Sequence, residues 1–215
     1  MEESTSKEKI LKNIRNALIN KLENPFQNVD FESPLYTRED EADDVIFATE
    51  FSRIGGKFLY CANEMELLNG LAELIPAEGL KSISSFDPGI RALLESAEIE
   101  ILPLNADFVD IKVGVSYCQA LLSRTGSILM TSAQASGRRL MAFANVHIVI
   151  AFASQLVPDI KDALVNLREQ YLDDLPSMIT VISGPSRTAD IEKTLVMGAH
   201  GPKELYLFFV DDSDI

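Results

Sequence analysis

The sequence has few residues of the kinds that bind metals or form disulfides. It holds two cysteines, Cys61 and Cys118, and two histidines among 215 residues. The cysteines are far apart and form no Cys-x-x-Cys pair, which excludes a zinc ribbon or a cysteine-ligated iron–sulfur cluster within this chain. A metal site built only from protein would need carboxylates beside the two histidines. We therefore expect no metal and no iron–sulfur cluster in this chain, and the sequence names no other cofactor.

Basic residues are also scarce. Nineteen Lys and Arg stand against 33 Asp and Glu, which gives a formal net charge of −14 and a pI near 4.5. A chain of this charge repels phosphate backbones and anionic lipid unless a local basic patch is present, and no such patch is evident in the sequence. We expect no nucleic-acid partner.

Long apolar runs are missing as well. The longest, Ile148–Ala153 and Leu205–Val210, are far too short to span a bilayer. The first residues, Met-Glu-Glu-Ser-Thr-Ser-Lys, lack the apolar segment of a signal peptide. These absences predict a cytoplasmic protein without a membrane span.

The chain begins with a pattern typical of an amphipathic helix. Apolar residues recur at helical spacing from Ile10 to Leu22, and Thr5 with Glu8 forms a capping box. Asn24-Pro25 ends the helix, and the following residues show no clear period. We predict that residues 1–37 form a helical arm with a connector and that residues 38–215 form one α/β domain.

Helical and strand patterns alternate through that domain, and the strands are almost continuously apolar. This alternation is typical of an α/β fold in which helices cover both faces of a central sheet. The predicted helices span 38–54, 63–76, 88–97, 119–124, 158–171 and 188–197. The predicted strands span 57–61, 81–84, 98–102, 112–117, 127–131, 147–152, 178–183 and 203–210.

The segment from Ile179 to Glu192 is the first candidate site. A buried strand ends at Ser183, Gly184 and Pro185 form a turn, and polar residues open the next predicted helix. The free N–H groups of a helix N-terminus favour an anion, and the Arg187 guanidinium adds a planar fork for carboxylate or phosphate. The candidate ligand-binding residues of this segment are Gly184, Ser186, Arg187 and Thr188. Alternatively, Ser186 or Thr188 only caps the helix and Arg187 pairs with Asp190.

Two further segments supply candidates. His200 lies between Gly198 and Gly201-Pro202, on a loop from which an imidazole can reach a ligand. The second segment contains the turn Thr125-Gly126, the arginine pair Arg138-Arg139 and His147 at the start of a strand; the alternative for His147 is a half-buried side chain bonded to a backbone carbonyl. No nucleophile elbow, His-Glu-x-x-His or Gly-x-Gly-x-x-Gly is present. The residues alone therefore indicate a site for a small anionic ligand and identify no reaction.

Two strings carry a family resemblance. Ser183-Gly-Pro-Ser-Arg-Thr-Ala-Asp-Ile-Glu192 and Gly198-Ala-His-Gly-Pro-Lys-Glu-Leu205 closely resemble the hallmark of the LUD domain, the lactate-utilisation family of the LutC/YkgG type. Upstream, Thr125-Gly126, Gly137-Arg138 and Val146-His147-Ile148 follow the order of that family. The resemblance covers residues 110–210 well and the first hundred residues loosely.

The resemblance implies a fold like the isomerase and coenzyme-A-transferase group and a role in oxidising L-lactate to pyruvate. It also implies partner proteins with iron–sulfur or cysteine-rich domains, which would carry the electrons because this chain lacks clustered cysteines. Arg124 departs from the family pattern, which commonly has an acidic residue before Thr-Gly. If that carboxylate is catalytic elsewhere, this chain has lost it.

Two other readings stay open. One is a free-standing enzyme acting on a phosphorylated sugar or a coenzyme-A thioester, for which Asp190, Glu192 or His200 would be the candidate general base. The other is a non-catalytic binding or scaffold module that uses the N-terminal helix to hold a partner.

Overall fold

The computed structural model describes residues 5–19, 30, 33, 36, 41–136, 138–172, 174–189, 195–197 and 201–212. The chain divides into two compact units, Met1–Asp40 and Glu41–Ile215. The first contains helix α1, Ser6–Ile19. Its predicted capping box is confirmed, because the Glu8 amide donates to Thr5 Oγ1 (3.3 Å) and the Thr5 amide donates to Glu8 Oε2 (2.8 Å).

A five-stranded parallel sheet forms the centre of the second unit. Its strands lie in the order β1-β11-β6-β3-β2, and every neighbouring pair is parallel. Their bounds are Lys57–Cys61 (β1), Ile83–Ser84 (β2), Val113–Tyr117 (β3), Val146–Phe152 (β6) and Glu204–Val210 (β11). The inner strands are apolar on both faces, as expected for a sheet covered on both sides.

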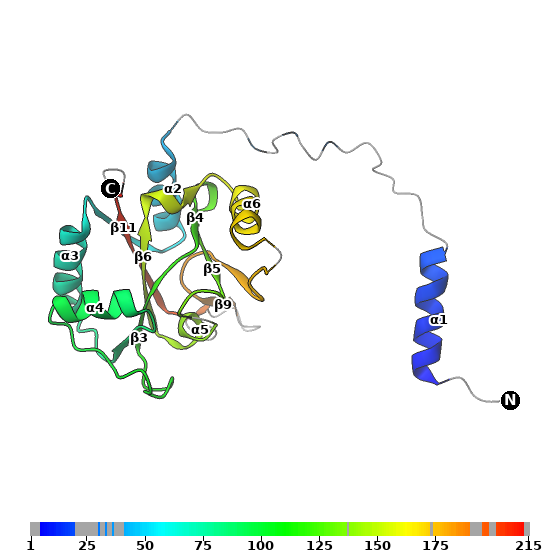
Figure 1. Ribbon diagram of the computed structural model, residues 1–215, viewed down its shortest axis with the longest axis horizontal. Coiled ribbons are helices and arrows are strands. Elements are labelled where there is room, and N and C mark those ends of the chain that lie inside the picture. The colour runs from blue at the N-terminus through cyan, green and yellow to red at the C-terminus, as the bar shows by residue number, and fades with distance from the viewer. Residues whose placement is uncertain are drawn as a thin grey trace. The chain divides into compact units, whose positions relative to one another are not determined.

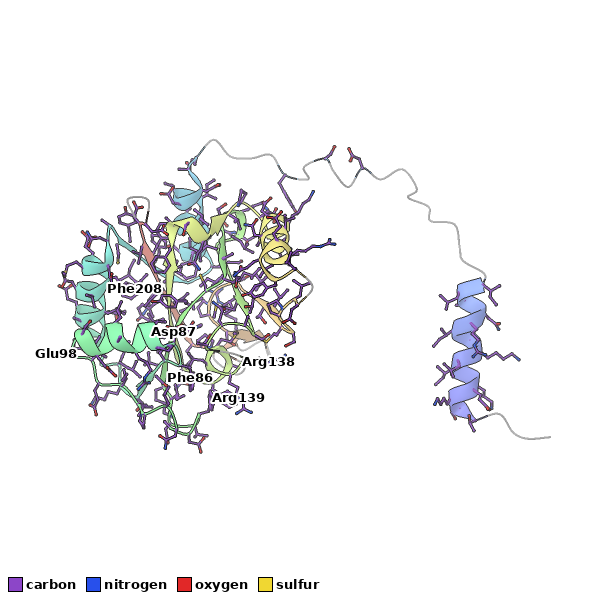
Figure 2. The ribbon with its side chains drawn as sticks, in the orientation of Figure 1. Phe86, Asp87, Glu98, Arg138, Arg139 and Phe208 are labelled. Carbon is purple, nitrogen blue, oxygen red and sulfur yellow. The ribbon has the colours of Figure 1, made fainter. Side chains whose placement is uncertain are left out.

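Helices α3 (Glu64–Ala77) and α4 (Pro88–Ser96) cover one face of this sheet (Figure 1). Their apolar faces share one buried cluster with alternate strand residues such as Val115 and Ile150. Phe208 of β11 points toward α3 and lies so close to Gly70 that a Cβ there would be 2.8 Å from its ring (Figure 2). Side-chain packing therefore explains a glycine in the middle of α3.

Helix α2 (Asp43–Arg53) and a second sheet cover the other face (Figure 1). The second sheet has the order β7-β4-β5-β8, and its β4–β5 and β5–β8 pairs are antiparallel. Helix α6 (Ile160–Tyr171) packs on the outer side of this sheet. The strand bounds are Ala120–Leu122 (β4), Ser127–Thr131 (β5), Leu156–Val157 (β7) and Ile179–Ile182 (β8).

The remaining elements are short. Turns of 3₁₀ helix span Ser123–Thr125 (η1) and Ala153–Gln155 (η2), and helix α5 spans Leu140–Phe143. Strands β9 (Arg187–Ala189) and β10 (Leu195–Met197) pair antiparallel with each other.

The predicted α/β class, with a layered sheet covered by helices, is confirmed. Three local predictions are wrong. Residues 119–124 form β4 and η1 instead of a helix, and residues 98–102 contribute a single bridge, Ile83–Ile101, instead of a strand. The predicted helix over 188–197 is contradicted at both ends, because its described residues belong to β9 and β10.

Candidate functional site

The first of the two motifs, which begins at Ser183 directly after β8, lies against the C-terminal end of α2. Gly184 has a positive φ of 77°, and a Cβ on it would be 2.5 Å from the Ile54 carbonyl oxygen. Arg187 Nη2 donates a hydrogen bond of 2.8 Å to the same carbonyl. A cation at the C-terminal carbonyls of a helix is in the favourable place for the helix dipole. Arg187 therefore ties the motif to α2 through this bond.

The expected anion site at a helix N-terminus is wrong in its geometry. Ser186 is followed directly by strand β9, which begins at Arg187, so no helix begins here to direct free N–H groups at a ligand. The Ser186 amide is itself used, because it donates to the Pro202 carbonyl over 2.8 Å. The bond joins the Ser186 turn to Gly201-Pro202, where the second motif enters β11. The two motifs thus meet near the amino end of the parallel sheet.

Thr125 and Gly126 form the end of η1, packed on α2. Gly126 has a φ of 57°, and a Cβ there would lie 2.2 Å from the Phe51 amide nitrogen. A distance this short means that only glycine lets η1 reach the backbone of α2. The Thr125 hydroxyl is buried and has no hydrogen-bond partner among the described residues.

His147 is fully buried near the amino end of β6 and forms a polar pair with Ser116 of β3. Its Nε2 lies 2.8 Å from the Ser116 hydroxyl oxygen. Burial lowers the pKa of His147 to about 4, so the ring is neutral at pH 7. Its Nδ1 has no hydrogen-bond partner in the described part of the chain. The alternative reading of His147, a half-buried side chain bonded to a backbone carbonyl, is therefore wrong: the ring is fully buried and pairs with Ser116, and no described residue bonds its Nδ1.

Ser116 is a residue that the sequence reasoning missed. Strand β3 reads Val-Gly-Val-Ser-Tyr, and its small residues Gly114 and Ser116 share one face because strand side chains alternate. Gly114 lies in register with His147 on one side and with Ser84 of β2 on the other. The Ser84 hydroxyl is also buried and without a partner among the residues described. Leu140 of α5 covers Gly114, where a Cβ would approach its side chain to 2.8 Å.

The two arginines that precede α5 lie at the periphery of the second unit (Figure 2). Arg138 donates to the Ser177 hydroxyl, and the Arg139 guanidinium lies 5.4 Å from the centre of the Phe108 ring. Arg138 is exposed, so its guanidinium can also meet an anion from solvent. Asp190, Glu192 and His200, the candidate acids and base, lie outside the described residues, and of Thr188 the structure describes only the backbone, in β9.

Arg124 has a structural partner. Its guanidinium donates two hydrogen bonds, of 2.7 and 2.9 Å, to the carboxylate of Asp159, the N-cap of α6. This guanidinium lowers the pKa of the Asp159 carboxyl. Arg124 therefore fastens η1 to the start of α6.

Metal and redox groups are sparse in the described residues. No group of three or more His, Cys, Asp and Glu side chains there is arranged to hold a metal ion, and no helix there is long and apolar enough to cross a membrane. Cys61 and Cys118 are both buried and unpaired. Burial raises the pKa of the Cys118 thiol to about 12.

The fold places this chain in a class of α/β proteins that includes a solved structure. The crystal structure of a DUF162 family protein from Deinococcus radiodurans superposes with a TM-score of 0.60 at 19% identity, covering 79% of this chain and 99% of that one. The LUD domain model matches residues 46–210. This chain belongs to the LUD domain family.

Several bacterial proteins are similar in sequence to this chain, and two of those compared below are named for lactate utilization. Lactate utilization protein C of Geobacillus sp. is 32% identical over 168 residues, which are 69% of this chain and 70% of that protein. Lactate utilization protein C of Bacillus licheniformis is 31% identical over 102 residues, 46% of this chain and 42% of its own length. The uncharacterized protein YkgG of Escherichia coli is 38% identical over 103 residues, 46% and 45% of the two chains. The matched regions of the last two thus span less than half of each relative.

Proposed function

We propose that this chain takes part in lactate utilization, as a component of a system that oxidises L-lactate to pyruvate. The observation that carries the proposal is family membership together with the relatives named lactate utilization protein C, one of which matches over more than two thirds of both chains. The electrons are carried by partner proteins with iron–sulfur or cysteine-rich domains, since each cysteine of this chain is buried alone.

In this proposed system, the chain binds a small anionic ligand near the amino end of the parallel sheet. His147 supports this because the ring is neutral and buried, and its Nδ1 is unused by any described residue. An unpaired buried polar atom costs about 1–3 kcal/mol, which a ligand oxygen or hydroxyl would recover. A 2-hydroxy acid offers both donors and acceptors, so it satisfies Nδ1 in either tautomer of the ring.

The negative charge of such a ligand requires a positively charged side chain to bind it, and we propose Arg138 for this role. It lies two residues before α5, whose Leu140 covers Gly114, the register partner of His147. The neighbouring Arg139 lies over the Phe108 ring and serves as a matched control. We propose that Arg138 meets the carboxylate and that His147 and the Ser186 hydroxyl hydrogen-bond the rest of the ligand.

Deleting the gene tests the role in lactate utilization. We expect the deletion strain to grow poorly on L-lactate as the carbon source and normally on glucose, and the intact gene to restore growth. Normal growth of the deletion strain on lactate would refute the role.

Ligand binding is tested separately with the purified chain. We expect L-lactate or pyruvate to raise the melting temperature of the wild type and of Arg139→Ala, and to have no effect on Arg138→Ala. His147→Gln keeps an amide near the Ser116 hydroxyl and removes Nδ1, so it should fold and lose the response. An equal response in all four proteins, or none in the wild type, would disprove this site.

A further inference from the structure

Strand β8 forms an edge of the second sheet. It is the last strand in the order β7-β4-β5-β8, and β5 is its pairing partner among the described strands. The carbonyl of Met178 accepts a hydrogen bond of 3.0 Å from the Ser132 amide, so by alternation the backbone groups of Thr180 also point toward β5. The backbone groups of Ile179 and Val181 therefore point outward, where no described strand pairs with them.

This edge lacks the features that keep an open strand from pairing with another chain. Residues 177–183 read Ser-Met-Ile-Thr-Val-Ile-Ser, without a charge, a proline or a glycine. The side chains of Ile179 and Val181 are 38% and 39% exposed. The other outer strands of the two sheets are protected, because β2 and β7 have two residues each and β1 begins with the charged Lys57. Among these four strands, β8 is thus the best suited to pair with a further strand.

We propose that β8 pairs antiparallel with β8 of a second copy of this chain. The strand complements itself when Thr180 faces Thr180 of the second copy across a two-fold axis. In this register Ile179 faces Val181 of the second copy, and the symmetry repeats the pair. The outward backbone groups of these residues then lie opposite each other, so each pair exchanges both of its N–H···O bonds. Facing β-branched side chains add stability to such a pair.

The same register suits the rest of the strand. Met178 faces Ile182 of the second copy, on the side where both side chains already pack against the apolar cluster between the two sheets. Ser177 faces Ser183 at each end. Arg138 donates to the Ser177 hydroxyl, and its two copies lie at opposite ends of the pair because the strands run in opposite directions. A shift by one residue would set outer-face side chains against inner-face ones.

A strand of a second copy satisfies this edge better than a helix or a lipid surface does. The outward N–H and C=O groups of β8 need partners, whereas a helix such as α1 uses its own backbone groups internally and lipid tails have none. The net charge of −14 also opposes anionic lipid. A parallel pair of β8 strands related by a two-fold axis would join the outer face of one sheet to the inner face of the other, so Ile179 and Val181 of the two copies would not meet.

Sedimentation of the full chain over a range of concentrations tests the pairing. We expect a reversible dimer. Val181→Lys sets a charge against Ile179 of the second copy in both pairs and should weaken dimerisation at least about tenfold. Val165→Lys is the matched control, because Val165 is 49% exposed on the side of α6 opposite its buried residues, and it should leave dimerisation unchanged. Circular dichroism checks that both variants are folded.

Crosslinking through introduced cysteines tests the register. In Thr180→Cys the two thiols face each other in a non-hydrogen-bonded pair, with about 4.5 Å between Cα atoms, which suits a disulfide. In Ile179→Cys they are diagonal neighbours about 7–8 Å apart, although Ile179 is the more exposed residue and collides more often with other molecules. We expect mild oxidation to give a covalent dimer with Thr180→Cys much faster than with Ile179→Cys. Cys61 and Cys118 are buried and do not compete.

Three results would overturn the proposal. The first is the mass of a single chain at every concentration, which would leave the β8 edge to a strand of a different protein. The second is a Val181→Lys dimer as tight as the wild type. The third is equal crosslinking of the two cysteine variants, which would contradict the register even if Val181→Lys failed to fold. None of these results depends on growth on lactate or on the thermal response to lactate or pyruvate.

Discussion

Replacing Gly126 by alanine separates a packing role for the Thr-Gly turn from a ligand-binding one. The new Cβ would lie 2.2 Å from the Phe51 amide nitrogen and 2.4 Å from the Glu50 carbonyl carbon, and backbone atoms cannot rotate away as a side chain can. Overpacking of this kind costs about 1–3 kcal/mol or more. The left-handed φ of 57° adds about 1–2 kcal/mol for any residue with a Cβ. We expect the free energy of unfolding to fall by roughly 2–5 kcal/mol, the sum of the two effects.

Gly79 provides the matched control. Its φ of 61° is nearly the same, but a Cβ there would meet nothing within 4 Å. Gly79→Ala should therefore lose only the conformational part, about 1–2 kcal/mol. Urea unfolding followed by circular dichroism measures both losses under the same conditions. If the two variants lose equal stability, the contact between η1 and α2 does not require a glycine and our reasoning fails.

Three further predictions concern stability. Arg124→Met should lower the unfolding free energy at pH 7 by about 0.5–1 kcal/mol, since the ion pair with Asp159 is partly exposed. Because Arg124 lowers the pKa of Asp159 in the folded state, the ion pair stabilises the fold above about pH 4 and this stabilisation is lost as the pH falls further. The variant, which lacks the ion pair, should therefore lose less stability in acid than the wild type. His147→Gln should flatten the pH dependence of unfolding between about pH 6.5 and pH 4, where the unfolded histidine takes up a proton that the buried ring refuses. Arg187→Met should cost about 1 kcal/mol by removing the bond to Ile54, without changing the ligand-induced rise in melting temperature. Unfolding titrations across pH check the first two, and thermal shifts check the third.

Local patterns predicted most of the fold because they record interactions within one element. The predicted capping partners of α1 and α3 make the expected bonds, such as the Glu66 amide to Asn63 Oδ1 at 3.0 Å. Continuous apolar runs predicted the inner parallel strands, which are covered on both faces. Alternation of helices and strands was enough to set the fold class.

The errors lie where tertiary contacts override local preference. Ala120-Leu121-Leu122 favours a helix in isolation. In the fold these residues form a strand, because Leu121 faces the parallel sheet while Ala120 and Leu122 face α6. The stretch after Arg187 has helical spacing too, yet its described ends form strands β9 and β10, which pair antiparallel with each other. The spacing of apolar residues within one segment does not reveal such a pairing between strands.

The sequence identified His147 as a candidate site residue but did not predict which side chains surround it. Its partner Ser116 is 31 positions earlier, on the adjacent strand, and a serine within a strand carries no motif. Only the register of β3 against β6 brings the two side chains together. The same limit applies to Arg187, whose bonding to Ile54 depends on how the motif packs on α2.

The two buried cysteines make the chain convenient to label. Burial raises the pKa of Cys61 to about 11 and that of Cys118 to about 12, so almost no thiolate exists at neutral pH to react with a maleimide. A cysteine introduced at an exposed position of α1 would therefore be the preferred point of attachment for a fluorophore or spin label, without removing either native thiol.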